Sequence, residues 1–319
     1  MDKLIIKVLS FIDKYQLIEN KKTVLAAVSG GHDSLCMLHL LNEIKNIRGF
    51  DLKVMHLNHD FRAEADSDME FVKSVSEKLG LEFFGEKVNV EQYAKKQGIS
   101  FETAGRQVRY EFFDRVASEF PDSVIATAHN ANDNIESFFM HLMRGSGLNG
   151  LSGISAKRDN IIRPLLFVTR EEIESYCNDH KIVPVIDITN ESDDYTRNDI
   201  RHNVIPEVLK RCSIDSLTRT MDIINEENRF FEQYVKSIAK SCIIDYNGVS
   251  KLVVKQFKVL DKAVKRRILY EFLKDSPDVG LIHIDGIIEI AEKNRGGSIA
   301  ELPGGKKIKL NKGMLEIDE

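Results

Sequence analysis

Residues 28–34, Val-Ser-Gly-Gly-His-Asp-Ser, have the residue types of a phosphate-binding turn. An apolar run precedes them and helix-compatible sequence follows, so a strand, a glycine turn and a helix start are expected. Two adjacent glycines let backbone N–H groups approach a ligand, while Ser29, Ser34 and the helix N-terminus add donors. The alternative is a tight turn in which Asp33 or Ser34 only caps the helix. The spacing matches neither the usual P-loop nor a dinucleotide-binding motif.

Two carboxylates could hold a cation beside bound phosphates. Asp33 lies in the turn, and a carboxylate beside phosphates makes physical sense when a cation lies between them. Mg²⁺ fits this requirement, because proteins usually hold it with one or two carboxylates together with substrate phosphates. Asp133, which follows another predicted strand, is the second candidate ligand. Each of them could instead cap its helix.

Three further charged residues could act on a substrate. Glu136 follows Asp133 by three residues, so both share one helical face, and Glu136 could receive a cationic amine. A solvated surface glutamate is the alternative. Arg197 and Arg201 lie four residues apart and could clamp a phosphate or carboxylate, or form ordinary salt bridges. We expect Asp133, Glu136, Arg197 and Arg201 to form the catalytic group together with Asp33.

Other polar residues follow a second predicted strand. Asn58, His59 and Arg62 could line a nucleoside pocket, although His59 could equally be a strand-end histidine with a local hydrogen bond. Arg106 and Arg109 form another pair on a predicted helix. Structural pairing or an RNA-facing role is favoured for them over catalysis.

The elements that must position these residues alternate between strand and helix. Strands are expected at residues 23–27, 51–59, 83–90 and 123–128. This alternation predicts an α/β fold with a doubly wound parallel sheet. In such sheets ligand-binding groups gather beyond the carboxyl ends of the strands, where the polar residues above fall. We expect a catalytic domain over residues 1–214 and a smaller, mainly helical domain over residues 215–319.

The C-terminal part is more basic. Residues 217–242 are expected to form one long connecting helix, and residues 250–272 another helix. Its stretch 251–267 carries seven basic residues against one acid, a local charge of +6. The last segment, with Gly296-Gly297 and Gly304-Gly305, is typical of short strands and hairpin turns.

Composition restricts the class of protein. The 319 residues are 42% hydrophobic and 30% charged with a net charge of −5, which fits a soluble globular protein with any RNA site confined to a local patch. The cysteines are widely spaced and are expected to be reduced and structural; they are Cys36, Cys177, Cys212 and Cys242. No signal peptide or membrane span is expected, which favours a cytoplasmic location.

The Ser29–Ser34 turn resembles the S-G-G-x-D-S signature of the N-type ATP pyrophosphatases, or PP-loop enzymes. An ordered set of clusters over residues 22–206 is similar to the tRNA(Ile)-lysidine synthase branch of that family. These clusters are Leu57-Asn58-His59-Asp60-Phe61-Arg62, Gly105-Arg106 to Arg109-Tyr110, Ala126 to Asp133 and Glu136, Arg144-Gly145-Ser146-Gly147-Leu148, Arg163-Pro164-Leu165-Leu166, Asp187 to Asn190, and Tyr195-Thr196-Arg197-Asn198 to Arg201 and Pro206.

The resemblance implies an ATP-dependent ligase. Such an enzyme adenylates the C2 oxygen of the wobble cytidine, C34, in a tRNA(Ile) with a CAU anticodon, and releases pyrophosphate. The side-chain amine of free lysine then displaces AMP to give lysidine, with Asp133 or Glu136 as candidate general base. The implied ATP-binding residues are Ser29, Gly30, Gly31, His32, Asp33, Ser34, Asn58, His59 and Arg62, and Mg²⁺ would be held by Asp33 and Asp133.

The resemblance also implies tRNA contacts outside the catalytic group. The expected tRNA-binding residues are Arg106, Arg109, Lys258, Lys262, Arg266 and Arg267, although a merely solvated basic helix face is the alternative for the last four. An ATP-dependent tRNA sulfur-transfer enzyme is the rival activity, which the missing paired cysteines disfavour, and a nucleotide-binding regulator without catalysis is a second alternative. The oligomeric state is open, with a homodimer as one candidate.

Overall fold

The computed structural model describes residues 2–19, 22–60, 65–185, 195–246, 248–276 and 278–318. The chain divides into two compact units, Met1–Ile224 and Asn225–Glu319. Arg62 and residues 187–190, which were singled out from the sequence, lie outside the described residues.

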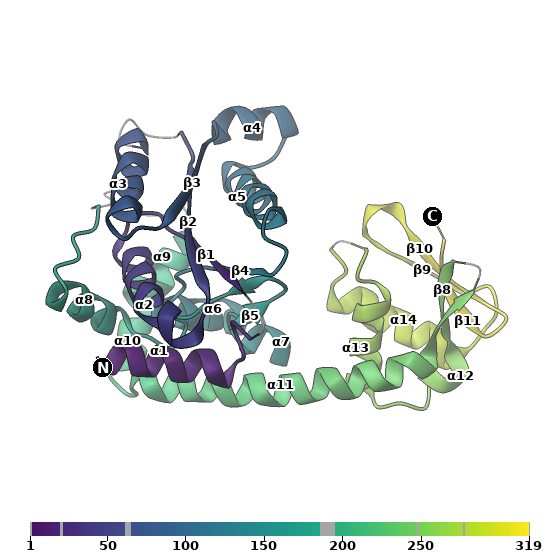
Figure 1. The fold of residues 1–319 in the computed structure, drawn as a ribbon. Helices are drawn as coiled ribbons and strands as arrows, with labels where there is room; N and C mark the ends of the chain where they lie inside the picture. Colours follow the sequence, from purple (N-terminus) through teal and green to yellow (C-terminus); the bar gives the residue numbers. More distant parts are fainter. Residues whose placement is uncertain are drawn as a thin grey trace. The chain divides into compact units, whose positions relative to one another are not determined.

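The first unit is built on a six-stranded sheet of order β3-β2-β1-β4-β6-β5 (Figure 1). Its strands are β1 (Thr23–Ala27), β2 (Asp51–Asn58), β3 (Glu82–Lys87), β4 (Ser123–Ala126), β5 (Lys157–Arg158) and β6 (Ile161–Ile162). All neighbouring pairs are parallel except β5 with β6. The order runs outward from β1 in both directions, so the prediction of a doubly wound parallel sheet is confirmed.

Helices pack against both faces of this sheet, as Figure 1 shows. They are α1 (Lys3–Lys14), α2 (His32–Arg48), α3 (Ala65–Lys78), α4 (Val90–Gln97), α5 (Phe101–Ser118), α6 (Ala131–Met143), α7 (Leu148–Leu151), α8 (Arg170–Asp179), α9 (Tyr195–Asp199) and α10 (Ile205–Leu209). Neighbouring residues of β1 join different clusters: Val24 packs with residues of α1, α2 and α8, and Leu25 packs with Phe112 and Phe113 of α5. This follows from the two-residue period of a strand, which sends successive side chains to opposite faces.

The second unit contains a smaller sheet of order β7-β8-β11-β10-β9, antiparallel throughout. Its strands are β7 (Ile243–Tyr246), β8 (Val249–Val253), β9 (Ile299–Glu301), β10 (Lys307–Asn311) and β11 (Met314–Asp318), and its helices are α12 (Val254–Phe257), α13 (Lys262–Phe272) and α14 (Leu281–Lys293). The long helix α11 (Ile214–Cys242) begins in the first unit and ends in the second. Buried residues of these elements form a core of their own around Phe257, Ile268 and Leu310.

The prediction of one helix over residues 250–272 is wrong. Residues 250–253 belong to β8, and a turn separates α12 from α13. The cause is tertiary: Leu252 is fully buried opposite Leu315 of β11, and Lys251 lies opposite Glu316. Pairing with a strand more than 60 residues away in sequence overrides a local pattern that suited a helix.

Candidate active site

The turn after β1 has a backbone that favours glycine. Gly30 has a φ of +98°, a region that side chains rarely adopt, and its carbonyl accepts a hydrogen bond from the N–H of Val185. The Ser34 hydroxyl accepts from the N–H groups of Ser29 and Gly30 at 3.2 and 3.1 Å, and donates to the carbonyl of Gly31 at 3.0 Å. Ser34 therefore braces the turn from inside, and its hydroxyl proton is not directed at a ligand.

The N-terminus of α2 supplies the free donors of this turn. The first N–H groups of an α-helix have no carbonyl partner within the helix, and in α2 they belong to His32, Asp33 and Ser34. Gly31 is the N-cap residue, and among the described residues no side chain, that of Asp33 included, makes a cap bond at this end, in contrast to the alternative considered from the sequence. The end of α2 is thus open to an anion.

Asp33 carries the clearest sign of an absent partner. Its Oδ1 atom is buried and accepts no hydrogen bond from the described residues. Burial raises the pKa of Asp33, while the charge of Arg170 and a hydrogen bond from the Asn130 side chain oppose that shift. A buried carboxylate oxygen without a partner is costly, so a cation at this atom would remove the cost.

Asp133 lies at the start of α6 and caps this helix, which is one of the two roles considered for it. The Asn130 side chain accepts from the N–H of Asp133 at 3.1 Å, and Asp133 Oδ2 accepts from the N–H of Asn130 at 3.1 Å, forming a capping box. Burial raises the pKa of Asp133, and the negative charges of Glu136 and Asp33 add to the shift. The two aspartates are therefore close enough to interact, although their separation in sequence is large.

Glu136 is buried, which excludes the solvated surface position considered from the sequence. Only 2% of the residue is exposed, and both carboxylate oxygens are held by arginines. Arg197 Nε donates to Oε2 at 2.7 Å, and Arg201 donates from Nε to Oε1 at 2.6 Å and from Nη2 to Oε2 at 3.0 Å. Arg197 Nη2 also lies 3.4 Å from Asp133 Oδ1. The two arginines thus clamp a carboxylate of the protein itself.

The backbone around Pro206 explains how both arginines reach Glu136. Residues Ile200–Val204 form one π-helical turn between α9 and α10, with the N–H of Ile205 bonded to the carbonyl of Ile200. Proline has no N–H to continue an α-helical ladder, which accounts for a local change of hydrogen bonding. Buried Ile135, Phe139, Ile200, Ile205 and Met221 pack α6 against this segment.

Sequence reasoning gave no role to two basic residues near the ends of β4 and β6, His129 and Arg163. Burial and the positive charges of Arg163, Arg197, Arg109 and Arg106 lower the pKa of His129 to about 4. Arg163 is buried; it donates to the carbonyl of Ser155, while its Nε finds no partner among the described residues. Arg163 directly follows β6 and His129 lies three residues after the end of β4, and this position near strand ends was the available signal.

Asn58 and His59, at the end of β2, have different surroundings. Asn58 donates to Asp66 at 2.9 Å and accepts from the N–H of Asp60 at 2.8 Å, so its side chain shapes the strand end. Burial and the neighbouring charge of Arg109 lower the pKa of His59 to about 4. A neutral His59 therefore lies beside Arg109, and the prediction that these residues line a nucleoside pocket stays a prediction.

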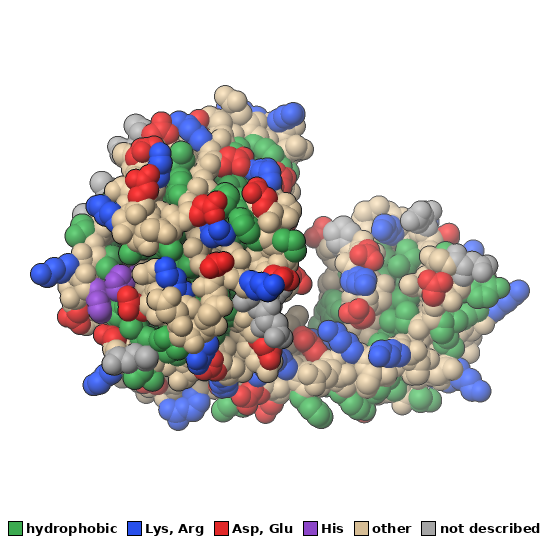
Figure 2. Space-filling model, in the orientation of Figure 1, with side chains coloured by type: hydrophobic (Ala, Val, Ile, Leu, Met, Phe, Trp, Pro, Cys, Tyr) green, Lys and Arg blue, Asp and Glu red, His purple; other side chains and the backbone are tan. Residues whose placement is uncertain are grey.

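The basic segment of the second unit is more neutral than its sequence suggested. Acids from other segments pair with Lys251, Lys262, Lys265, Arg266 and Arg267. Arg266 makes two bonds to Asp285, whereas Lys258 is exposed and has no acidic partner among the described residues. On the face drawn in Figure 2, acidic and basic side chains are mixed over both units. The +6 count considered one segment in isolation, which is why it overstated the local charge.

A cation site in this unit would depend on the carboxylates of Asp33 and Asp133. Within the described ranges, no cluster of three or more His, Cys, Asp or Glu side chains could hold a metal by itself. Asp33 and Asp133 provide two neighbouring carboxylates, one with a buried unpaired oxygen. Mg²⁺ commonly takes few protein carboxylates and completes its shell with phosphate and water, so this donor set fits Mg²⁺ bound together with a nucleotide.

Comparison with known proteins adds independent evidence. A family model for the PP-loop domain matches residues 2–208. The chain is 36% identical over 321 aligned residues to the tRNA(Ile)-lysidine synthase of Clostridium acetobutylicum, covering 97% of this chain and 68% of that protein. The chain belongs to the tRNA(Ile)-lysidine synthase family of PP-loop proteins. The resemblance noted in the sequence is thereby confirmed.

A second curated relative agrees with this assignment. The tRNA(Ile)-lysidine synthase of Caldanaerobacter subterraneus subsp. tengcongensis is 39% identical over 93% of this chain and 65% of its own length. The chain therefore spans about two thirds of these curated relatives. A solved U34-tRNA thiolase from Methanococcus maripaludis superposes with a TM-score of 0.56 at 20% identity, over 70% of this chain and 79% of the thiolase, which shows a shared fold. In the described part of the chain, no helix has both the length and the apolar character of a membrane span.

Proposed function

We propose that this protein is a tRNA(Ile)-lysidine synthase, which uses ATP to adenylate the C2 oxygen of cytidine 34 and then joins lysine to C2. The observation that carries the proposal is the buried, unpaired Asp33 oxygen beside Asp133 at the open end of α2, in a chain of this family. The proposal includes Mg²⁺, a CAU anticodon, free lysine and a cytoplasmic location. A homodimer stays a prediction.

The phosphate turn would bind the triphosphate of ATP. N–H groups of His32 and Asp33 face an anion at the helix end, and Asp33 and Asp133 would hold Mg²⁺. When bound, Mg²⁺ offsets the negative charge of the departing pyrophosphate. In the first step the cytidine O2 attacks the α-phosphorus of ATP, and the bond to pyrophosphate breaks.

In the second step the lysine amine attacks C2 and AMP leaves with the C2–O bond electrons. The amine must lose its proton to attack, and Asp133 is the better acceptor of the two candidates. Three guanidinium N–H groups occupy the oxygens of Glu136, whereas among the described residues Asp133 Oδ1 has the 3.4 Å contact with Arg197. Glu136 would therefore hold Arg197 and Arg201 in position, while Asp133 would accept the proton of the lysine amine.

Arg106 and Arg109 remain proposed contacts to tRNA. No acidic residue among the described residues forms an ion pair with either, and Arg106 packs its guanidinium over the Tyr110 ring at 5.1 Å. Arginines without an acidic partner attract phosphate, and an unpaired anticodon loop lets a base enter the site at low cost.

A direct assay tests this function. Protein, ATP, a tRNA(Ile) transcript and labelled lysine are mixed, and tRNA-borne label and pyrophosphate are measured. We expect both products, each absent with Asp33→Asn, while Asp159→Asn, at an exposed loop position, keeps full activity. Absence of lysine-dependent incorporation with the unmodified protein contradicts the proposal. Sulfur incorporation would instead support the rival activity, and ATP binding without either product would support a regulator.

A further inference from the structure

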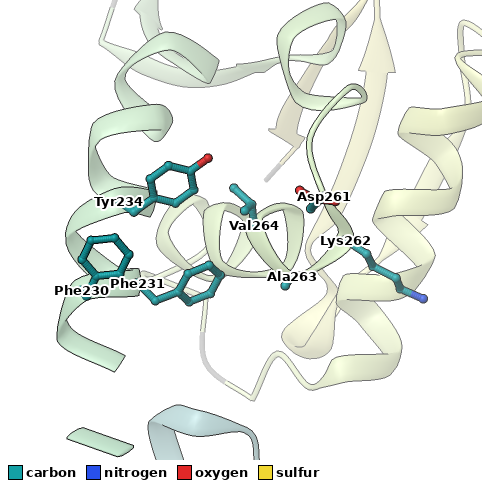
Figure 3. Close-up of a pocket in the computed structure, with 7 residues that line it drawn as sticks. All are labelled: Phe230, Phe231, Tyr234, Asp261, Lys262, Ala263 and Val264. Carbon is teal, nitrogen blue, oxygen red and sulfur yellow. The ribbon is translucent and has the colours of Figure 1, made fainter. Parts of the chain in front are cut away.

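The second unit contains a groove that the proposed chemistry does not use. It encloses about 570 Å³ and is lined by Phe230, Phe231, Tyr234, Asp261, Lys262, Ala263 and Val264. Figure 3 shows the three rings on α11 facing the first residues of α13. All these residues belong to Asn225–Glu319, so the groove is complete within this unit.

Two of the three rings, Phe230 and Tyr234, do not pack into the core of this unit. Phe230 is 72% exposed and Tyr234 is 48% exposed, and their spacing of four places them on the same helical face. Phe231, by contrast, packs against the core of this unit, with the Arg267 guanidinium 5.6 Å from its ring. Leaving two neighbouring aromatic rings in water is unfavourable, so a partner that covers them gains from their burial.

The charges around the groove indicate what kind of partner this is. Asp261 is the N-cap residue of α13, yet its carboxylate makes no cap bond and is free to accept a hydrogen bond. Lys262 is 62% exposed and extends away from the rings in Figure 3, toward Asp285. Lys258 is exposed three residues before Asp261. A flat base on the rings with an amine group at the carboxylate would match the groove lining, and exposed Lys258 nearby in sequence is available to a phosphate.

We propose that this aromatic groove, residues 230–234 with residues 261–264, binds an unpaired nucleotide of the tRNA by stacking its base on Phe230 and Tyr234. The inference rests on the proposed function, because it takes tRNA as the substrate. An apolar peptide would leave the Asp261 carboxylate without a donor. A base within a duplex already stacks on both faces, so the groove selects single-stranded nucleotides.

The absence of tryptophan from the chain allows a direct test. Phe230→Trp introduces a single tryptophan into the groove, which can be excited selectively, and Tyr246→Trp places one at a 58% exposed position on β7 as a matched control. A single-stranded CCA trinucleotide and unmodified tRNA should quench the fluorescence of the Phe230→Trp variant but not that of the control variant. A blunt RNA duplex should quench neither. Equal quenching by duplex, or no quenching by the trinucleotide and tRNA, overturns the proposal.

A second measurement separates this inference from the proposed function. The double variant Phe230→Ala with Tyr234→Ala should raise the KM for tRNA about tenfold or more, with kcat at saturating tRNA unchanged, whereas Tyr246→Ala changes neither. The pair Phe230→Tyr with Tyr234→Phe keeps both rings and should retain a normal KM. If the unmodified protein incorporates lysine and the double alanine variant keeps its KM, only the groove inference fails. A change in sedimentation of the double variant without a change in KM would assign the groove to self-association.

Discussion

Replacing Glu136 by glutamine tests whether this buried carboxylate holds the two arginines of the site. Glu136 accepts three guanidinium hydrogen bonds at 2.6, 2.7 and 3.0 Å. A hydrogen bond to a charged group contributes about 1.5–3 kcal/mol. Glutamine keeps one oxygen acceptor but directs an N–H₂ group at the arginines, so at least one bond and the charge are lost.

The side chains of Arg197 and Arg201 are 33% and 30% exposed, so water compensates part of this loss. We therefore expect Glu136→Gln to lower the free energy of unfolding by about 2–3 kcal/mol. For a unit of this size that corresponds to a Tm lower by roughly 4–12 °C. Lysine incorporation should fall as well, because Arg197 and Arg201 lose their fixed positions.

Thermal unfolding followed by circular dichroism measures the effect, and Glu207→Gln is the control. Glu207 lies on the adjacent α10 and is 59% exposed, with Lys210 and Arg211 as its partners. Its replacement should change stability by no more than about 0.5 kcal/mol. A Tm for Glu136→Gln equal to that of the control would refute the argument that the buried carboxylate organises the site.

Three other predictions concern Asp33, His129 and the two lysines Lys258 and Lys262. Because burial raises the pKa of Asp33 above its unfolded value, its ionised form costs stability at neutral pH and this cost disappears as the pH falls through the raised pKa. Asp33→Asn should therefore abolish pyrophosphate release while the Tm at pH 7 stays equal or rises; a clear fall in Tm would contradict this. With a pKa of about 4, His129 should show no NMR titration between pH 5.5 and pH 8, and a midpoint near 6.5 would be inconsistent with its surroundings. Neutralising Lys258 and Lys262 should flatten the dependence of log Kd on log salt for tRNA by about 0.7–0.9 per lost phosphate contact, which filter binding at several salt concentrations can measure against Lys22→Ala as the control.

Much of the first unit could be predicted from local sequence. The apolar run in residues 23–27 and the following glycines indicate a strand that enters a phosphate turn, and the structure places β1 and α2 there. The same logic located Asn58 and Asp133 near strand ends, because parallel strands bring their carboxyl ends to one edge of the sheet. Local sequence was sufficient here because both the strand and the glycine turn after it depend on residues that are close together in the chain.

The partners of charged side chains could not be predicted in this way. Glu136 seemed as well suited to the surface as to a site, and its burial depends on arginines 61 and 65 positions later. Arg266 seemed free to bind tRNA, yet Asp285, 19 positions later, takes two of its hydrogen bonds. A charge count over a segment omits such acids.

The sequence by itself determined the phosphate turn, the parallel α/β sheet and the set of residues at its carboxyl edge, because these depend on short-range periodicity, glycine conformation and strand direction. Only the tertiary structure decided that Ser34 braces the turn, that Asp33 retains an unpaired buried oxygen and that Glu136 is clamped by Arg197 and Arg201. Burial and ion pairing depend on segments that are distant in sequence, and therefore the different surroundings of Asp33 and Glu136 depend on them as well.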